Sequence, residues 1–430
     1  MKFVSTRGRT PAASLSATLA AGLAEDGGLF VPGHVPAFDD AACDPAAPLA
    51  PFAAAMLAPY FRGDALEPAL GAIADESLDI DAPLVALAGV GDFALELFHG
   101  PTAAFKDYGA RFLARCLARI SAERTRTVLV ATSGDTGGAV AAAFEGMAGF
   151  RVAILYPRGR VSARQAHQLG AFGDNVEAIS VDGSFDDCQR LAKQAFADPG
   201  LRARAPLLSA NSISLGRLLP QSTWFAHAAS RFLADTGERL SFAIPSGNLG
   251  HATACALARA MGAPIGGIAL ATNANRTIPE WLAHGELRAR RSVATLANAM
   301  DVGDPSNAER LRWLHPAPAE RASAFIADSV DDAAILGRIR ASAGAGYVPC
   351  PHTACALELI ARRRAAGDAT PWCAAATAHP AKFETVVEPL LGRTIALPAG
   401  LRATLARPSR ATPLAADYAV LRDHLLAGAR

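Results

Sequence analysis

The sequence predicts an α/β protein in which helices cover both faces of doubly wound, parallel-type sheets. Two observations carry this prediction. From residue 96 onward, apolar runs of strand length alternate with longer stretches of helical periodicity, and two loops between a strand and the next helix are rich in glycine. A chain that returns to a sheet in the parallel direction needs a helical crossover, so this alternation favours parallel sheets.

The chain has 430 residues, which is too long for one ordinary core, and its pattern changes near residue 95. We therefore predict a mixed α+β N-terminal domain at residues 1–95. A central region at 96–390 is expected to contain two interleaved α/β domains, roughly 96–240 and 241–390. Residues 391–430 are expected to form a C-terminal tail that packs on the central region.

The N-terminal domain shows helical spacing in three stretches. Apolar residues recur there every three or four positions, which predicts helices at 14–23, 51–61 and 66–80. Two consecutive glycines predict a turn into a brief strand at 29–31, which Pro32 ends. Two short strands are expected within 84–97. No set of catalytic side chains is recognisable in this domain.

The central region alternates strands with helices. Short apolar runs that end at glycine, proline or polar loops predict strands at 127–131, 152–156, 176–181, 207–210, 242–245, 268–272 and 373–376. Helical spacing between them predicts helices at 138–147, 187–196, 218–234 and 251–261. Residues 273–345 show a less regular pattern, which predicts no definite elements.

Charge and composition exclude several classes of function. The formal net charge is +1, and the arginines are scattered along the chain. We therefore expect neither a nucleic-acid partner nor a membrane partner. The first residues lack the apolar core of a signal peptide, and no stretch approaches about 20 uninterrupted apolar residues. These features predict a cytoplasmic protein.

The seven cysteines form an odd set without CxxC pairs, which predicts free thiols in a reducing compartment. Cys350, His352 and Cys355 lie close together in the sequence. A structural zinc site normally uses four ligands, and no second pair with suitable spacing follows. We therefore predict no metal site.

Lys106 follows the apolar Phe105 and stands where a helix is expected to begin. Apolar side chains recur at helical spacing from there, at Phe112, Leu113, Cys116, Leu117 and Ile120. Burial disfavours the ammonium form of a lysine, and the positive end of the helix dipole repels it. A Schiff-base lysine needs a neutral amine. A lone lysine in a first helical turn is more often at the surface, so the assignment depends on two loops elsewhere in the chain.

The two glycine-rich loops have the same construction. TSGDTGG at 132–138 and SGNLG at 246–250 each follow a predicted strand and open a predicted helix. Glycines let backbone N–H groups approach a ligand, and the helix N-terminus adds partial positive charge, so each loop can bind an anion. Neither loop is GxxxxGK[ST] or GxGxxG, which argues against nucleoside triphosphates and dinucleotides.

Two anion-binding loops and a lysine predict a ligand in which anionic groups flank an imine. Pyridoxal 5′-phosphate (PLP) supplies a phosphate and an aldehyde, and an amino-acid substrate supplies a carboxylate. Basic and amide side chains follow other predicted strands, at the edge where α/β folds bind ligands. They are Arg158, Arg164, Asn211 and Arg217.

With these motifs the chain resembles threonine synthase of the fold-type II PLP enzymes, in its long form. The resemblance covers nearly the whole chain. It is carried by GLAEDGGLFVP, LFHGPTAAFKDYGARF, ATSGDTGGAVAAAF, LYPRGRVS, SANSISLGRLLPQ, IPSGNLGHATA, ATNANRTIPEWL, NAMDVGDPSN and ATAHPAKFE. It implies two catalytic α/β domains preceded by a separate N-terminal domain.

The resemblance implies how this chain binds the cofactor. Lys106 holds PLP as a Schiff base and is the catalytic residue. The backbone N–H groups of Gly247, Asn248, Leu249 and Gly250 bind its phosphate. Thr377 offers a hydroxyl to the pyridine nitrogen, and a hydroxyl does not force that nitrogen to be protonated as a carboxylate does.

The substrate contacts follow from the same resemblance. Ser133 and Thr136 hold the substrate carboxylate, and Arg158, Asn211 and Arg217 contact the substrate phosphate. Asp135 departs from many fold-type II enzymes, in which an asparagine at this position contacts the cofactor's 3′ oxygen. An aspartate repels a phenolate there unless a proton is shared or the side chain turns away.

The implied reaction converts O-phospho-L-homoserine and water to L-threonine and phosphate. Three alternatives stay open: a PLP-dependent serine/threonine dehydratase, a sulfur-assimilating synthase, which normally has asparagine in place of Asp135, and a non-enzymatic binding protein on the same scaffold. Lys382 is the rival basic residue, and we expect it to contact an anion or solvent and not to form the imine. The sequence leaves the oligomeric state open between monomer and dimer.

Overall fold

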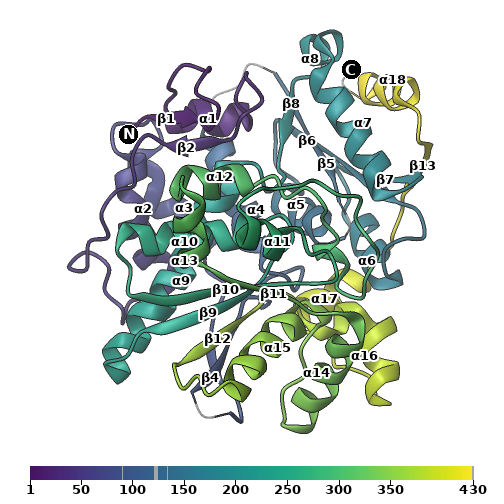
Figure 1. Ribbon diagram of the computed structural model, residues 1–430. Coiled ribbons are helices and arrows are strands. Elements are labelled where there is room, and N and C mark those ends of the chain that lie inside the picture. The colour runs from purple at the N-terminus through teal and green to yellow at the C-terminus, as the bar shows by residue number, and fades with distance from the viewer. Residues whose placement is uncertain (90, 121–123, 133, 429–430) are drawn as a thin grey trace.

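The computed structural model describes residues 1–89, 91–120, 124–132 and 134–428 (Figure 1). Two separate sheets, each flanked by helices, form the main body, and a small two-stranded sheet lies near the N-terminus. The α/β class predicted from the sequence is confirmed. Among the described residues, no helix combines the length and apolar character needed to cross a membrane.

The larger sheet has six strands in the order β11-β10-β9-β12-β4-β3. Neighbours run parallel except β3 and β4 at one edge, which are antiparallel. The strands are β3 (Leu84–Ala86), β4 (Asp92–Glu96), β9 (Leu240–Pro245), β10 (Ile265–Thr272), β11 (Ile326–Ser329) and β12 (Trp372–Ala376). Strand β4 pairs with β12 over its full length, so this sheet extends across the boundary that the sequence suggested near residue 95.

The smaller sheet has five parallel strands in the order β13-β7-β6-β5-β8. They are β5 (Arg126–Ala131), β6 (Phe150–Pro157), β7 (Val176–Asp182), β8 (Leu207–Ser209) and β13 (Thr412–Ala415). No sequence pattern predicts β13, which has four residues and contains a proline. It forms because it pairs with β7, where Thr412 Oγ1 also donates to Glu177 Oε1 at 2.8 Å.

The N-terminal segment has an antiparallel pair of strands followed by helices. Its elements are β1 (Phe3–Ser5), α1 (Leu15–Ala21), β2 (Phe30–Pro32), α2 (Leu49–Phe61), the 3-10 helix η1 (Glu67–Ala69) and α3 (Leu70–Ser77). Helix α2 packs on α3 and on α9 (Leu215–Thr236), so this segment is attached directly to the main body.

The remaining helices cover the two large sheets. They are α4 (Lys106–Arg119), α5 (Asp135–Phe144), α6 (Ala163–Gly170), α7 (Phe185–Ala197), α8 (Pro199–Arg204), α10 (Gly250–Met261), α11 (Thr277–His284), η2 (Asn298–Met300), α12 (Ala308–Leu314), α13 (Pro318–Ala324), α14 (Asp332–Gly344), α15 (Pro351–Ala365), η3 (Pro380–Phe383), α16 (Glu384–Leu391), α17 (Ala399–Leu405) and α18 (Tyr418–Ala427). Most helices within 273–345 have only seven or eight residues, too few for a clear periodicity.

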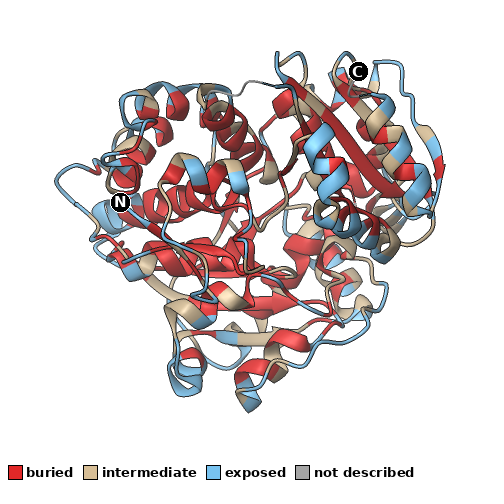
Figure 2. Cartoon of the chain, turned by 90° about the horizontal axis from the view of Figure 1, so that it is seen from above, coloured by how far each residue is buried: buried red, intermediate tan, exposed pale blue. Residues whose placement is uncertain are grey.

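Figure 2 shows that burial is concentrated in the strands and in the helices between the two large sheets. Helix α9 is buried along most of its length and packs against α4 and α10. Helix α4 has the predicted amphipathic pattern: Phe112, Leu113, Cys116 and Leu117 are fully buried or nearly so. On its other face Arg111, Arg115 and Arg119 form ion pairs with Glu76 and Asp79 of the N-terminal segment.

Candidate active site

Lys106 is the first residue of α4, as the sequence predicts, and its neighbours fix its position. The backbone N–H of Phe105 donates to Thr377 O at the end of β12, at 2.9 Å. The Phe105 ring stacks on the imidazole of His251, with centroids 4.4 Å apart and planes 15° apart. Because His251 follows Gly250, these two contacts hold Lys106 between the Thr377 loop and the loop at 246–250.

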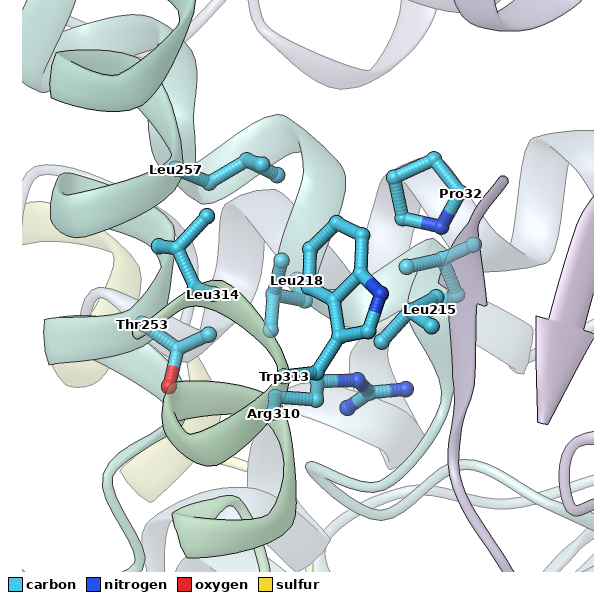
Figure 3. A pocket seen from close by; sticks show the side chains of 9 residues that line it. Pro32, Leu215, Leu218, Thr253, Leu257, Arg310, Trp313 and Leu314 are labelled. Carbon is cyan, nitrogen blue, oxygen red and sulfur yellow. The ribbon is translucent and has the colours of Figure 1, made fainter. Parts of the chain in front are cut away.

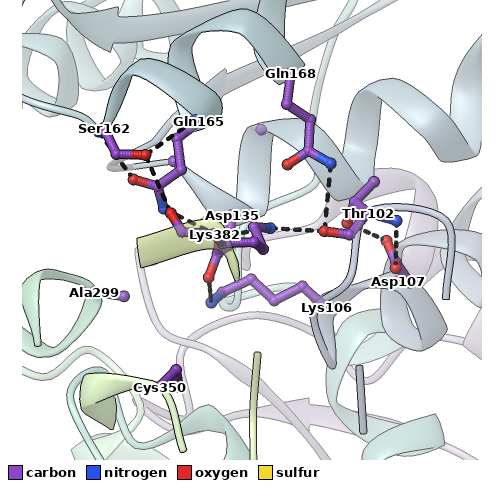
Figure 4. Close-up of polar contacts among 12 residues, drawn as sticks. Thr102, Lys106, Asp107, Asp135, Ser162, Gln165, Gln168, Ala299, Cys350 and Lys382 are labelled. Carbon is purple, nitrogen blue, oxygen red and sulfur yellow. Dashed lines mark hydrogen bonds and ion pairs between the residues drawn. The ribbon is translucent and has the colours of Figure 1, made fainter. Parts of the chain in front are cut away.

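The surroundings of Lys106 favour its neutral form. Its side chain is 17% exposed, and Nζ lies 3.8 Å from Asp135 Oδ2 (Figure 4). Burial is the largest influence and lowers the pKa of Lys106 below the usual 10.5. Asp135 opposes this shift, whereas the positive charges of Lys382 and Arg217 reinforce it. The net direction is the one expected of an amine that forms a covalent bond with an aldehyde.

The loop at 246–250 has the form of an anion-binding site. Leu249 has a left-handed backbone with φ of 61°, and a Cβ on Gly247 would lie 2.8 Å from Met300 Cα. No described residue accepts a hydrogen bond from the backbone N–H groups of Gly247, Asn248, Leu249 or Gly250. Four consecutive donors at the start of α10 are therefore available to a phosphate, so the loop fits the phosphate of PLP.

A chain of hydrogen bonds ties this loop to the N-terminal segment. Asn248 Nδ2 donates to Ser212 Oγ at 2.7 Å, and Asn307 Nδ2 donates to Asn248 O at 3.0 Å. Arg310 Nη1 in turn donates to Asn307 Oδ1 at 2.7 Å. The Nε and Nη2 atoms of Arg310 donate to Phe30 O of β2, at 3.1 and 3.0 Å. Arg310 thus connects β2 with the loop that would hold the phosphate.

Arg310 also lines a small apolar cavity between β2, α9, α10 and α12 (Figure 3). Its other walls include Leu218, Leu257, Trp313 and Leu314. The cavity volume is about 10 Å³, which is about the space of one water molecule. It is too small for a substrate or an effector, so it does not compete with the Lys106 region as a functional site.

In the second glycine-rich loop, at 132–138, the helix begins earlier than the sequence predicts. Thr132 Oγ1 accepts hydrogen bonds from the N–H groups of Gly134 and Gly137, both at 3.0 Å. Gly134 adopts φ of 137°, and α5 therefore begins at Asp135 and not near 138. Thr136 lies half-buried in the first turn. Ser133, also expected to bind substrate, lies outside the described residues.

Asp135 lies between two lysines. Lys382 Nζ is 2.8 Å from Asp135 Oδ1, and Gln165 Nε2 donates to the same oxygen at 3.2 Å. Burial alone would raise the pKa of Asp135, but Lys382 and Lys106 outweigh it and hold that pKa well below its usual range. Lys382 therefore contacts an anion, one of the two outcomes expected of it, and the anion is a side chain of this chain. Figure 4 shows Lys106 on the opposite side of the same carboxylate.

Arg217 is a buried cation near Lys106. It is 2% exposed, its Nη1 donates to Ala210 O at 2.5 Å, and its Nε has no partner among the described residues. Burial lowers its pKa to about 10. It packs on α4 so closely that a Cβ on Gly109 would lie 2.7 Å from Arg217 O. A buried guanidinium with a free donor and no ion-pair partner in the described chain suits an anionic ligand.

Two other residues were predicted to contact the substrate phosphate. Asn211 lies in the cluster around Arg217, and Arg158 lies outside it. Asn211 starts the loop that leads to Ser212, and its buried Oδ1 has no partner in the described part of the chain. Arg158 is exposed, and the described residues include no hydrogen-bond or ion-pair partner for its side chain. Arg164, the further basic residue noted in the sequence, pairs with Glu388 at 3.0 Å and is thus occupied.

Two histidines lie near Lys106 that sequence reasoning did not assign to its surroundings: His251 was not noted, and His352 was considered only as a metal ligand. His251 Nε2 accepts from Trp224 Nε1 at 3.3 Å, and burial lowers its pKa to about 3, so the ring is neutral. Burial also lowers the pKa of His352 to about 4, and its Nε2 accepts from the Ala299 N–H. Of these two residues, only His251 carries a signal in the sequence that places it near the site, because it directly follows SGNLG. The described residues contain no group of three ligands suited to a metal ion.

Three protein families match this chain along its length. Residues 81–376 match the family described as "Pyridoxal-phosphate dependent enzyme". Residues 2–78 match "Threonine synthase N terminus", and residues 353–425 match "Threonine synthase, C-terminal". PLP, predicted from the lysine and the two loops, is the cofactor of this family.

The chain is similar over its whole length to several known proteins. It is 36% identical to threonine synthase of Serratia marcescens, over 99% of both chains. The crystal structure of threonine synthase from Escherichia coli matches with a TM-score of 0.92 at 36% identity, covering 100% of both chains. A PLP-bound threonine synthase from Brucella melitensis matches with a TM-score of 0.91 at 33% identity, again over 100% of both chains. The chain thus belongs to the threonine synthase family of fold-type II PLP-dependent enzymes.

Proposed function

We propose that this protein converts O-phospho-L-homoserine and water to L-threonine and inorganic phosphate, as a PLP-dependent carbon–oxygen lyase of threonine biosynthesis. Full-length similarity to threonine synthases supports this activity. The observation that carries it is the juxtaposition of Lys106 with the start of α5 and with the loop at 246–250, whose four consecutive N–H groups have no acceptor among the described residues. A phosphorylated amino acid and PLP together need this set: an amine for the aldehyde and separate sites for their anions.

The cofactor is held by four features of the chain. Lys106 Nζ binds the aldehyde carbon, and the N–H groups of residues 247–250 bind the phosphate. Thr377 is buried, its backbone carbonyl accepts from the Phe105 N–H, and its hydroxyl would contact the pyridine nitrogen. Asp135, whose Oδ2 is 3.8 Å from Lys106 Nζ, would lie near the phenolic oxygen of bound PLP. Bound PLP supplies an electron sink for charge that develops at the substrate α carbon.

Lys106 is the base of the reaction. With the substrate bound, Nζ of Lys106 would be a free amine available to the α carbon. Burial keeps the pKa of Lys106 below that of an ordinary lysine, so the amine can take the α proton and later return a proton.

The substrate anions have separate sites. The start of α5, with Ser133 and Thr136, binds the carboxylate through the partial positive charge of the helix N-terminus. Arg217 and Asn211 bind the phosphate that leaves from the γ carbon, and the unpaired Nε of Arg217 supports this role. The predicted contact of Arg158 with this phosphate stays a prediction, because its side chain is exposed and lies outside this cluster.

The direct test is a product analysis. Purified protein loaded with PLP is given phosphohomoserine, and phosphate and threonine should appear in equal amounts. If a keto acid and ammonia appear instead, the protein is a serine/threonine dehydratase. A threonine deaminase from Solanum lycopersicum matches with a TM-score of 0.55 at 17% identity, which shows a shared fold and does not favour that activity.

We also propose that the protein acts in the cytoplasm on a small molecule, without a nucleic-acid partner. All seven cysteines are free and buried, which suits a reducing compartment, and the net charge of +1 gives no basic surface of the kind that nucleic acids need. Sedimentation would distinguish the monomer from the dimer.

A further inference from the structure

Asp135 creates an electrostatic problem for the cofactor. Its Oδ2 lies 3.8 Å from Lys106 Nζ, the atom that bonds to the PLP aldehyde carbon. The phenolic oxygen of PLP stands on the ring carbon next to the one that bears the aldehyde, so it lies close to the same nitrogen. A carboxylate 4% exposed next to a phenolate is unfavourable, because two like charges repel strongly where water is excluded.

Lys382, from a distant part of the chain, places a positive charge next to Asp135. It belongs to η3, after the Thr377 loop, and is 1% exposed. Its Nζ lies 2.8 Å from Asp135 Oδ1 and donates to Thr102 O at 2.7 Å. The pair is supported on both sides: Gln165 donates to Asp135, and Gln168 Nε2 donates to Thr102 O at 3.3 Å (Figure 4).

The composition of the chain makes this lysine stand out. The sequence has four lysines, at positions 2, 106, 193 and 382, among 41 lysines and arginines. Two of the four lie on either side of one carboxylate. An ammonium is a compact charge that can lie between a carboxylate and a carbonyl, whereas the larger planar guanidinium is best matched by a fork of acceptors.

We propose that Lys382 is a positioning residue for the cofactor: its ammonium neutralises Asp135, so that the carboxylate can lie beside the phenolic oxygen of PLP while Lys106 remains a neutral amine. The inference deepens the proposed function and rests on it. Without Lys382, the nearest cation to Asp135 is Lys106 itself, and Asp135 then stabilises the ammonium form of Lys106, which cannot attack an aldehyde.

The other charged groups around Lys106 support the direction of this effect. Asp135 and Cys350 raise the pKa of Lys106, and Lys382 and Arg217 lower it. On Asp135, Lys382 and Lys106 act together with a smaller influence from His352. Removal of Lys382 therefore leaves Asp135 opposed by burial and by Arg217 alone, and the pKa of Lys106 rises.

Three variants test the proposal with PLP alone: Lys382→Met, Asp135→Asn, and the two combined. The measurements are the dissociation constant of PLP for the apoprotein and the pH at which borohydride traps half of the cofactor on Lys106, identified by mass spectrometry. Lys382→Met should bind PLP at least tenfold more weakly and shift the trapping midpoint to higher pH. The combined variant should recover to within a few-fold of the parent protein, because it leaves neither charge unpaired. Lys193→Met, at an exposed position on α7, is the matched control.

Two results would overturn the proposal. One is parental PLP affinity and an unshifted midpoint in Lys382→Met; the other is a combined variant that binds no better than Lys382→Met although its thermal unfolding is unchanged. If Lys382→Met does not fold, the combined variant is compared with Asp135→Asn, and tenfold weaker binding in the combined variant contradicts the proposal. These measurements use no substrate, so a wrong product from phosphohomoserine would refute the proposed function without altering them.

Discussion

The N–H of Phe105 donates to the carbonyl oxygen of Thr377 at 2.9 Å, and this single bond joins the start of α4 to the end of β12. It connects the residue before the proposed Schiff-base lysine with the residue proposed to contact the pyridine nitrogen. Since the bond involves only backbone atoms, it persists when the side chain at position 106 is changed. A substitution of Lys106 therefore removes the reactive amine and leaves the backbone hydrogen bond that positions this residue.

Lys106→Ala should therefore keep the fold and lose the activity. It removes both the covalent bond to the cofactor and the base that moves the α proton. General acid–base assistance alone is worth about 10²–10⁴-fold, so phosphate release should fall by at least that factor. PLP should still bind weakly, because the loop at 246–250 holds its phosphate independently. Phosphate release and equilibrium dialysis measure the two effects, with Lys193→Ala as the control. Normal turnover by Lys106→Ala would refute the assignment.

Gly247→Ala should weaken PLP binding without removing any contact to the ring. A Cβ there would lie 2.8 Å from Met300 Cα and 3.2 Å from Ala299 O, so the backbone of the loop or of η2 must shift. Overpacking of this kind costs about 1–3 kcal/mol, which corresponds to roughly five- to 140-fold in affinity when it falls on the binding loop. Titration of the apoprotein with PLP measures it.

Gly71→Ala is the matched control for this substitution. Gly71 lies within α3, and nothing lies within 4 Å of a Cβ added there. Alanine should stabilise that helix by up to about 1 kcal/mol and leave PLP affinity unchanged. Unchanged PLP affinity in Gly247→Ala would mean that the loop is not the phosphate site.

Arg310→Met should loosen the loop proposed to hold the phosphate. Arg310 acts on this loop through Asn307, to which it donates and which in turn donates to Asn248 O. The change breaks the bonds to Phe30 and Asn307 and leaves buried carbonyl groups unpaired, at about 1–3 kcal/mol each. The affinity for PLP should fall more than the affinity for pyridoxal, which lacks the phosphate. Arg312→Met, exposed on the same helix, is the control. Equal losses for both ligands would show that Arg310 serves stability alone.

The pH dependence of reconstitution follows from the pKa of Lys106. Only the neutral amine attacks the aldehyde, so the rate at which apoprotein and PLP form a reducible complex should rise with pH and level off above that pKa. Burial lowers the pKa, so the midpoint should lie below 10.5. Asp135 raises the pKa of Lys106, and Asp135→Asn should therefore move the midpoint to still lower pH. A midpoint that moves upward in Asp135→Asn would contradict this account.

Local signals explain what the sequence could predict. The glycines and hydroxyl residues of the two loops are contiguous, and the turn each one makes depends on neighbours within a few residues. The same holds for Lys106 at a helix start and for the apolar face of α4. These features were predicted correctly, apart from the first turn of α5. There the Thr132 hydroxyl accepts hydrogen bonds from two backbone N–H groups, and the helix begins earlier than predicted.

The tertiary structure decided which distant residues meet. Lys382 reaches Thr102 O, and Arg310 reaches Phe30 O, in each case across 280 positions. Strand β13 similarly exists only because β7 offers a free edge. Such contacts leave no periodic trace, because each consists of one side chain or a few backbone groups whose partner is set by the packing of whole sheets. The sequence by itself determined Lys106 and the two glycine-rich loops that are proposed to bind anions. The charge partner of Asp135 and the hydrogen bonds of Arg310 between β2 and the neighbour of the loop at 246–250 required the folded chain, since only folding brings buried charges and carbonyl groups within hydrogen-bonding distance.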